Sequence, residues 1–222
     1  MPFTSGAVAH IDKYKQGFFF SREFVGDNSW NGYEHNCLFA NVGGGQFMDV
    51  ARPTGSDCVK DSRGVAVADF DGDGRLDMVI NNNNETPTVY LNDLKKTGNA
   101  FELKLVGAAA AQGSGPRSTR DAIGASVVVK AGGKTMTRQV EAGSGYASES
   151  MRPLHFGIGA ASSLESIEIR WPSGLVQRME GEQVEGWVNK LMRVEEGGAR
   201  AAELRPGGGG AAPAHGPQRA AL

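Results

Sequence analysis

VADFDGDGRLDMVI, residues 67–80, places four aspartates between two short apolar runs. The four are Asp69, Asp71, Asp73 and Asp77. Two unit charges about 4 Å apart repel each other by roughly 4 kcal/mol at an effective dielectric constant of 20, so a turn that gathers several carboxylates is costly without a cation. The stretch therefore predicts a loop that binds a hard metal ion.

The spacing D-x-D-x-D-G-x-x-D resembles the first nine positions of an EF-hand calcium loop. Position twelve, where an EF-hand carries a bidentate Glu, is Ile80, and the flanking runs GVAVADF and LDMVI have the β-branched, apolar character of strands. We therefore predict a strand-loop-strand unit in which Gly74 allows the sharp turn. The predicted ligands are four side-chain carboxylates and one backbone carbonyl: Asp69, Asp71, Asp73, Asp77 and the carbonyl of Arg75.

Calcium is the ion that this ligand set favours. Calcium accepts six to eight oxygen ligands in flexible geometry, whereas magnesium prefers few protein ligands and several waters in a strict octahedron. Zinc prefers His and Cys ligands, which the loop lacks. A solvated acidic turn without an ion is the alternative, and four carboxylates at this spacing make it the poorer one. The predicted cofactor is therefore Ca²⁺.

Short apolar runs separated by glycines predict an all-β chain. Two runs at 125–131 and 134–141 flank Gly132-Gly133, a pair suited to the positive φ values of a two-residue hairpin turn. A second pair is expected at 166–171 and 175–179, around the turn Pro172-Ser173-Gly174. Further strands are predicted at 101–106, near 154–158 and near 191–195. Strands at this spacing predict a β-sandwich or barrel-like domain over residues 99–196.

The composition changes along the chain and suggests its boundaries. Residues 1–35 are a poorly defined N-terminal segment, and residues 36–95 form the unit with the aspartate loop. Residues 107–121 are expected to be a loop within the 99–196 domain. The stretch from Gly197 onward is rich in glycine, alanine and proline without apolar periodicity, so we expect residues 197–222 to be a disordered tail.

Charge and hydropathy exclude two classes of partner. A formal net charge of −2 and the absence of a Lys/Arg cluster argue against nucleic-acid binding. No apolar run approaches the 18 or so residues of a membrane span, and the N-terminus lacks a basic region followed by an apolar core, so we expect no export signal in this chain.

Cys37 and Cys58 leave two alternatives: one disulfide, or two separate buried thiols, which we favour slightly.

Two groups of motifs resemble known families. LFANVGGGQFMDVA, RGVAVADFDGDGRLDMVINNNN and TVYLND are similar to the FG-GAP or VCBS repeat, the blade unit of calcium-binding β-propellers. RDAIGASVVVKAGGK, EAGSGYASES, LHFGIG, IEIRWPSG and NKLMRVEEG resemble the ASPIC/UnbV domain, in that order. The succession of both, over roughly residues 30–196, resembles the C-terminal end of the cartilage-acidic-protein-like family.

This resemblance implies one propeller-type blade at 36–95, an incomplete propeller, followed by a β-sandwich-like ASPIC/UnbV domain at 99–196. It implies an extracellular or cell-surface protein with a role in recognition or adhesion, and a protein or glycan partner. Because only one full repeat and no export signal are present, we expect a truncated product or a fragment of a longer protein.

No catalytic residue is predicted. His155 has no second histidine or cysteine nearby in sequence and is expected to be a half-buried strand residue. Ser144 lacks the flanking pattern of a G-x-S-x-G nucleophile. The expected function is a non-catalytic, calcium-binding recognition module. The alternatives are the accessory end of an enzyme that acts on polysaccharide, and a truncated fragment with no independent function.

Overall fold

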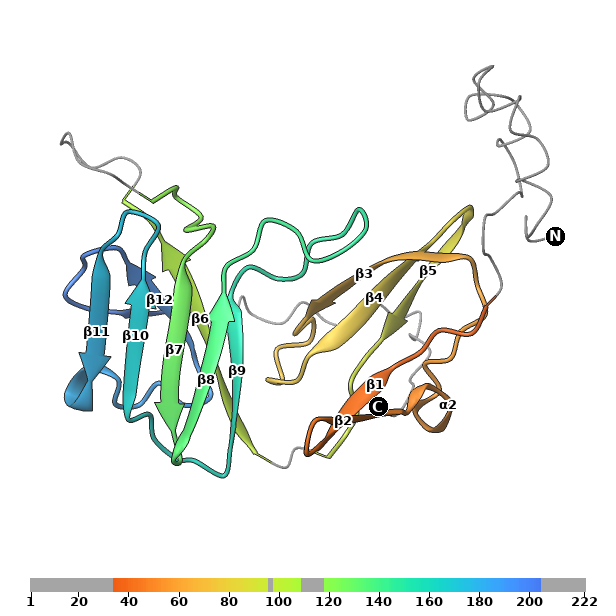
Figure 1. Ribbon diagram of the computed structural model, residues 1–222, viewed down its shortest axis with the longest axis horizontal. Coiled ribbons are helices and arrows are strands. Elements are labelled where there is room, and N and C mark those ends of the chain that lie inside the picture. The colour runs from red at the N-terminus through yellow and green to blue at the C-terminus, as the bar shows by residue number, and fades with distance from the viewer. Residues whose placement is uncertain (1–33, 96–97, 109–117, 205–222) are drawn as a thin grey trace, which may run out of the picture.

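The computed structural model describes residues 34–95, 98–108 and 118–204 (Figure 1). Within these ranges the chain is almost entirely β, in several sheets of which none closes into a barrel, and this confirms the predicted fold class. Residues 1–33 of the expected N-terminal segment, most of the loop expected at 107–121 and residues 205–222 of the expected tail lie outside the described ranges.

Two four-stranded sheets make up the part of the chain from residue 98 to residue 204, which we call the sandwich (Figure 1). The first sheet has the order β11-β10-β7-β8 and the second has the order β13-β12-β6-β9. Their bounds are β6 Asn99–Val106, β7 Ser126–Ala131, β8 Lys134–Gln139, β9 Leu154–Gly159, β10 Ser166–Arg170, β11 Val176–Glu180, β12 Leu191–Glu195 and β13 Ala202–Leu204, with a short 3-10 helix at Gly181–Gln183.

The core of the sandwich follows from strand alternation. In β7, Val127 and Val129 are fully buried, whereas Lys130 points to the opposite face and is exposed. Phe101 of β6 stacks on Phe156 of β9 with ring centroids 5.1 Å apart. The large apolar side chains that are less than 2% exposed come from strands of both sheets and from Val184, which follows the 3-10 helix: Phe101, Phe156, Leu103, Ile167, Ile169, Met179, Val127, Val129, Val184 and Val194. The two inner faces therefore enclose one apolar core.

Both predicted strand pairs of the sandwich form. β7 and β8 pair around Gly132 and Gly133, whose φ values of 56° and 71° are those that the expected turn requires. β10 pairs with β11 after the turn that contains Gly174. The alternating pattern did not reveal that β12 lies parallel to β6, with Leu191 opposite Glu102 and Val194 opposite Leu105.

β13 differs from the disordered tail expected from Gly197 onward. Ala202–Leu204 pairs antiparallel with β12, with Leu191 opposite Leu204 and Arg193 opposite Ala202. Without β13, the edge of β12 that faces away from β6 would be unpaired. Main-chain hydrogen bonds to this edge need no apolar periodicity in the pairing segment, which is why the sequence pattern did not predict β13.

Residues 34–95 form the unit that we call the blade. It holds a hairpin of β1 (Phe39–Gly43) and β2 (Gln46–Asp49), a single helical turn α2 (Ala51–Thr54), and a three-stranded sheet with the order β3-β4-β5. β3 spans Ser62–Ala68, β4 spans Asp77–Asn82 and β5 spans Glu85–Tyr90. The strand-loop-strand prediction is thus confirmed, with the aspartate loop between β3 and β4.

The blade buries few large apolar side chains. Among its described apolar residues only Ala51, Ile80 and Tyr90 are buried. Most of the large apolar side chains that are exposed within the described ranges also lie here: Phe39, Val42, Phe47, Met48, Val59, Val65, Phe70 and Leu94. Buried polar groups take part in holding the sheet together. Asn82 donates from Nδ2 to the Thr86 carbonyl at 2.8 Å and to Thr88 Oγ1 at 3.1 Å.

Both cysteines are free thiols. Their segments lie side by side, because the Asn36 amide donates to the Cys58 carbonyl at 3.0 Å. Cys37 is exposed and Cys58 is partly buried, in contrast to the two buried thiols that we favoured. A hydrogen bond with Asp49 raises the pKa of Cys37. Burial raises the pKa of Tyr90 to about 12, and Cys58 adds to the effect.

Candidate metal centre

The aspartate loop runs from the end of β3 to the start of β4, and the strand register holds both of its ends. Ala68 lies opposite Asp77 and Val67 opposite Met78, so residues 69–76 must turn within a narrow span. Gly72 and Gly74 have φ values of 77° and 86°, which residues other than glycine rarely adopt. The glycines of the motif therefore shape the turn that gathers the acids.

Asp69 organises the turn from inside. Its Oδ1 accepts hydrogen bonds from the amides of Gly72 at 2.8 Å and Asp73 at 3.1 Å, and its Oδ2 accepts one from the amide of Gly74 at 2.8 Å. Asp71 Oδ1 accepts from the Asp73 amide at 3.2 Å. The main chain is thus wrapped around the first carboxylate.

Three of the predicted ligands come together. Asp69, Asp71 and Asp77 each present a carboxylate oxygen, and the three oxygens lie within 4.8 Å of one another. Asp69 is partly buried, Asp71 is exposed and Asp77 is fully buried. Such an all-oxygen donor set, charged and open to solvent on one side, fits a hard divalent cation.

Asp77 is the buried member of the group. Its Oδ2 accepts from the Phe70 amide at 2.8 Å and its Oδ1 from the Asn92 amide at 2.8 Å. Burial raises the pKa of Asp77, the two amides oppose that shift, and the charges of Asp71 and Asp69 raise it further. A cation at this point would relieve the repulsion between the carboxylates.

Asp73 and Arg75 are placed differently from the other predicted ligands. One oxygen of Asp73 accepts from the Arg75 amide at 2.8 Å and the other forms an ion pair with the Arg75 guanidinium. Asp73 therefore lies outside the group of three acids. The assignment of the Asp73 carboxylate and the Arg75 carbonyl as metal ligands stays a prediction.

Asn92, which follows β5, is a site residue that sequence reasoning missed. Besides its bond to Asp77, it donates from Nδ2 to the Leu76 carbonyl at 3.2 Å, and its own carbonyl accepts from Arg75 Nε at 2.6 Å. The only signal in the sequence is an asparagine two residues after the end of a strand, a common turn residue.

The sandwich also contacts the loop. His155 of β9 lies with its Nε2 3.0 Å from the Gly74 carbonyl, and it is partly buried in a strand, as expected. Burial raises the pKa of Glu102, the β6 residue opposite His155, and the charge of Asp69 raises it further. A hollow of about 290 Å³ is lined by residues of both units, including Val67, Leu76, Met151 and His155.

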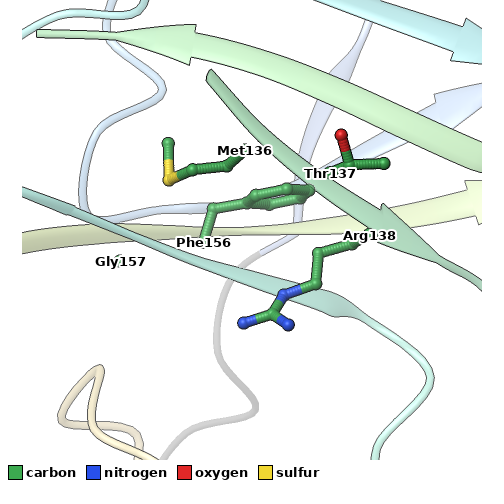
Figure 2. Close-up of a pocket in the computed structure, with 5 residues that line it drawn as sticks. All are labelled: Met136, Thr137, Arg138, Phe156 and Gly157. Carbon is green, nitrogen blue, oxygen red and sulfur yellow. The ribbon is translucent and has the colours of Figure 1, made fainter. Parts of the chain in front are cut away.

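A second hollow, of about 270 Å³, lies on the sandwich where β8 faces β9 (Figure 2). Met136 and Phe156 supply apolar surface, and Arg138 extends its guanidinium beside them. Thr137 and Gly157 complete the lining. This hollow contains one cationic group and no carboxylate.

No helix within the described residues is long and apolar enough to cross a membrane.

Comparison with known proteins gives three family matches. The model of the family described as ASPIC and UnbV matches residues 115–201, that of the FG-GAP-like repeat matches residues 24–80, and that of the FG-GAP repeat matches residues 63–100. The FG-GAP-like match ends within β4, and both FG-GAP matches include the aspartate loop.

Three curated relatives are cartilage acidic protein 1 from Xenopus tropicalis, Mus musculus and Homo sapiens. The chain is 47% identical to the first and 46% identical to the other two, in each case over 57 residues. The matched region covers 25% of this chain and 9% of each relative. The chain thus carries FG-GAP repeat sequence followed by an ASPIC/UnbV domain, and in this succession it resembles the cartilage-acidic-protein-like family.

Proposed function

We propose that the protein is a calcium-binding recognition module of an extracellular or cell-surface protein. The observation that carries the proposal is the group of three carboxylates, Asp69, Asp71 and Asp77, gathered within 4.8 Å by a glycine-shaped loop. FG-GAP repeat sequence over the same loop supports it. In this proposal the ion fixes the loop. The proposed domains are 36–95 for the blade and 99–196 for the ASPIC/UnbV domain, to whose second sheet β13 adds a further strand.

Calcium fits the site better than magnesium. The three carboxylates offer several oxygens at once from one loop. The carbonyl of Arg75 and the carboxylate of Asp73 complete the proposed set. Magnesium would instead keep most of its waters and use one or two carboxylates. When bound, the cation supplies positive charge that neutralises the loop; Asp77, held by two amides, orients the site from its buried side.

We propose a binding role rather than a catalytic one. The two side chains that a hydrolase would use have structural partners: His155 contacts the Gly74 carbonyl, and Ser144 Oγ lies 3.0 Å from Ser150 Oγ. The proposed partner is a protein or a glycan, as adhesion-type FG-GAP repeats suggest. Release of reducing or unsaturated ends from a polysaccharide panel would contradict the non-catalytic role.

The test is calorimetric titration of the metal-stripped full chain with CaCl₂, and with MgCl₂ for comparison. Asp71→Ala removes an exposed ligand without opening the fold, and we expect it to weaken calcium binding by about tenfold or more, because ligand charge sets affinity in such sites. The matched control is Asp93→Asn, an exposed acid of the blade outside the loop. No binding at millimolar calcium, or equal loss in both variants, would contradict the proposal.

A further inference from the structure

We infer that the second sheet of the sandwich supports the metal loop through direct contacts. Calcium binding and the docking of the blade on the sandwich therefore stabilise each other. The inference rests on the proposed calcium site and adds a consequence for the relation between the two units. Calcium binding and docking can be linked only if the metal loop makes contacts with the sandwich that exist in the docked arrangement and are absent without it.

The first contact covers the edge of the blade. β3 is an outer strand of its three-stranded sheet and would otherwise leave main-chain groups unpaired. The Met151 amide donates to the Val67 carbonyl at 3.0 Å, and the Val67 amide donates to Ser150 Oγ at 3.2 Å. A Cβ built on Gly64 would lie 3.0 Å from the Tyr146 carbonyl, so the sandwich approaches the β3 main chain closely. In Figure 1 the long loop between β8 and β9 reaches toward β3.

The second contact reaches the metal loop itself. Gly74 is held from both sides: its amide donates to Asp69 Oδ2 at 2.8 Å, and its carbonyl lies 3.0 Å from His155 Nε2. The peptide unit on one side of Gly74 is thus tied to a candidate metal ligand, and the peptide unit on the other side to the sandwich. A cation that orders Asp69 therefore also orders the group that His155 contacts.

The third element is a charge that the docked arrangement leaves without a partner. Glu102 is the cross-strand neighbour of His155, and both belong to the second sheet of the sandwich. Its Oε1 is buried and has no hydrogen-bond partner among the described residues, while Asp69 acts on it electrostatically. Without a cation, the carboxylates of Glu102 and Asp69 repel each other across the junction. A divalent cation offsets this repulsion and favours docking.

Hydrogen exchange of the full chain, followed by mass spectrometry with and without CaCl₂, tests the inference. The peptide over residues 146–152 reports docking, since the Met151 amide is bonded to the blade and lies outside the metal loop. At ten times the dissociation constant, we expect exchange in this peptide to slow by up to about tenfold. MgCl₂ at the same concentration controls for ionic strength.

The two ways in which this experiment can fail are distinguishable. If the titration shows no calcium binding, the proposed function fails, and the inference that rests on it fails as well. If calcium binds and slows exchange over residues 69–77 but leaves residues 146–152 unchanged, the proposed function stands and the linkage is wrong.

Glu102→Gln gives a result that a merely structural residue would not give. The variant keeps the shape of the side chain and removes the repulsion, so the 146–152 peptide should exchange severalfold more slowly than wild type without calcium and respond less to calcium. The control is Glu182→Gln, an exposed glutamate of the sandwich. Unchanged or faster exchange in calcium-free Glu102→Gln would overturn the role of this charge in the linkage.

His155→Ala tests the contact with the loop. We expect calcium to bind severalfold more weakly and its effect on residues 146–152 to fall below twofold, because the tie between Gly74 and the sandwich is lost. His35→Ala, which removes an exposed histidine of the blade, is the control. A wild-type calcium response in a folded His155→Ala variant would overturn the coupling through Gly74.

Discussion

The sandwich and the blade are both β-structures, but they are held together by different interactions. The sandwich places apolar side chains from two sheets into one core, with Phe101, Phe156 and Ile167 almost completely buried. The blade buries few large apolar groups and relies on hydrogen bonds to buried polar side chains such as Asp77 and Asn82. The sandwich should therefore be stable by itself, whereas the blade should depend on its acids, on an ion and on its contacts.

The largest expected effect is the loss of a core ring in the sandwich. Phe156→Ala removes a side chain that is 1% exposed and stacked on Phe101, so we expect a loss of about 3–5 kcal/mol in the free energy of unfolding. Urea unfolding followed by the fluorescence of the buried Trp171 and Trp187 measures it. A loss below about 1 kcal/mol would contradict the description of a close-packed core.

The next effect belongs to the blade. Asp77→Ala leaves the amides of Phe70 and Asn92 without their acceptor, at a cost of about 1–3 kcal/mol in the local stability of the blade. Hydrogen exchange of those amides measures the change. The urea transition of the sandwich serves as the internal control and should stay in place. If it shifts equally, the two units unfold together and the comparison breaks.

A smaller, pH-dependent effect is expected in the sandwich at Glu196. Burial alone would raise its pKa, but hydrogen bonds from the Ala108 amide and the hydroxyls of Ser173 and Ser118 outweigh it and hold the pKa of Glu196 below its usual range. A lowered pKa in the folded state means that the stabilisation is complete above the unfolded-state pKa and is lost as the pH falls through the folded-state value.

Glu196→Gln should therefore cost about 1 kcal/mol at pH 7 and less at pH 3, so that the unfolding curves of wild type and variant move closer together in acid. Urea titrations at both pH values measure this convergence, with Glu185→Gln, an exposed glutamate, as the control. A difference that stays constant between pH 7 and pH 3 would show that the network does not depend on the Glu196 charge.

The smallest effect is expected at an exposed ring of the blade. Phe47 lies in β2 with 64% of its surface exposed, so Phe47→Ser should change stability by no more than about 0.5 kcal/mol. It is the matched counterpart of Phe156→Ala, with the same residue type in the other unit. A loss of several kcal/mol in dilute protein would mean that Phe47 is covered in solution and that the blade has an apolar contact.

Patterns along the chain were sufficient to predict most strands. The apolar runs on either side of the glycine pair at 132–133 predict one hairpin, and the alternation in 166–170 before the turn at 172–174 predicts the other, because side-chain period and turn geometry are local properties. The parallel pairing of β6 with β12 was not predictable in this way, since an alternating strand looks the same whichever neighbour it takes.

The site was predictable in part for the same reason. The spacing of the acids is local, and in the structure Asp69, Asp71 and Asp77 lie together, while their role as metal ligands stays a prediction. Asp73 forms an ion pair with Arg75. Whether the Asp73 carboxylate pairs with this arginine or joins the other acids cannot be decided from the spacing of the motif. The contact of His155 with Gly74 joins segments far apart in the sequence and depends on how the two units dock, which single-strand patterns do not encode.

The position of β12 has a consequence for the order in which the sandwich forms. β6 lies between β9 and β12, so the middle of its sheet needs a segment that starts at Leu191. Such non-local pairing raises the contact order and slows folding, because the chain between β6 and β12 must lose conformational entropy before the contacts between the two strands form. During synthesis one edge of β6 stays unpaired until β12 has left the ribosome, when nearly the whole sandwich has been synthesised. Association of that edge with other nascent chains is the hazard that this topology creates.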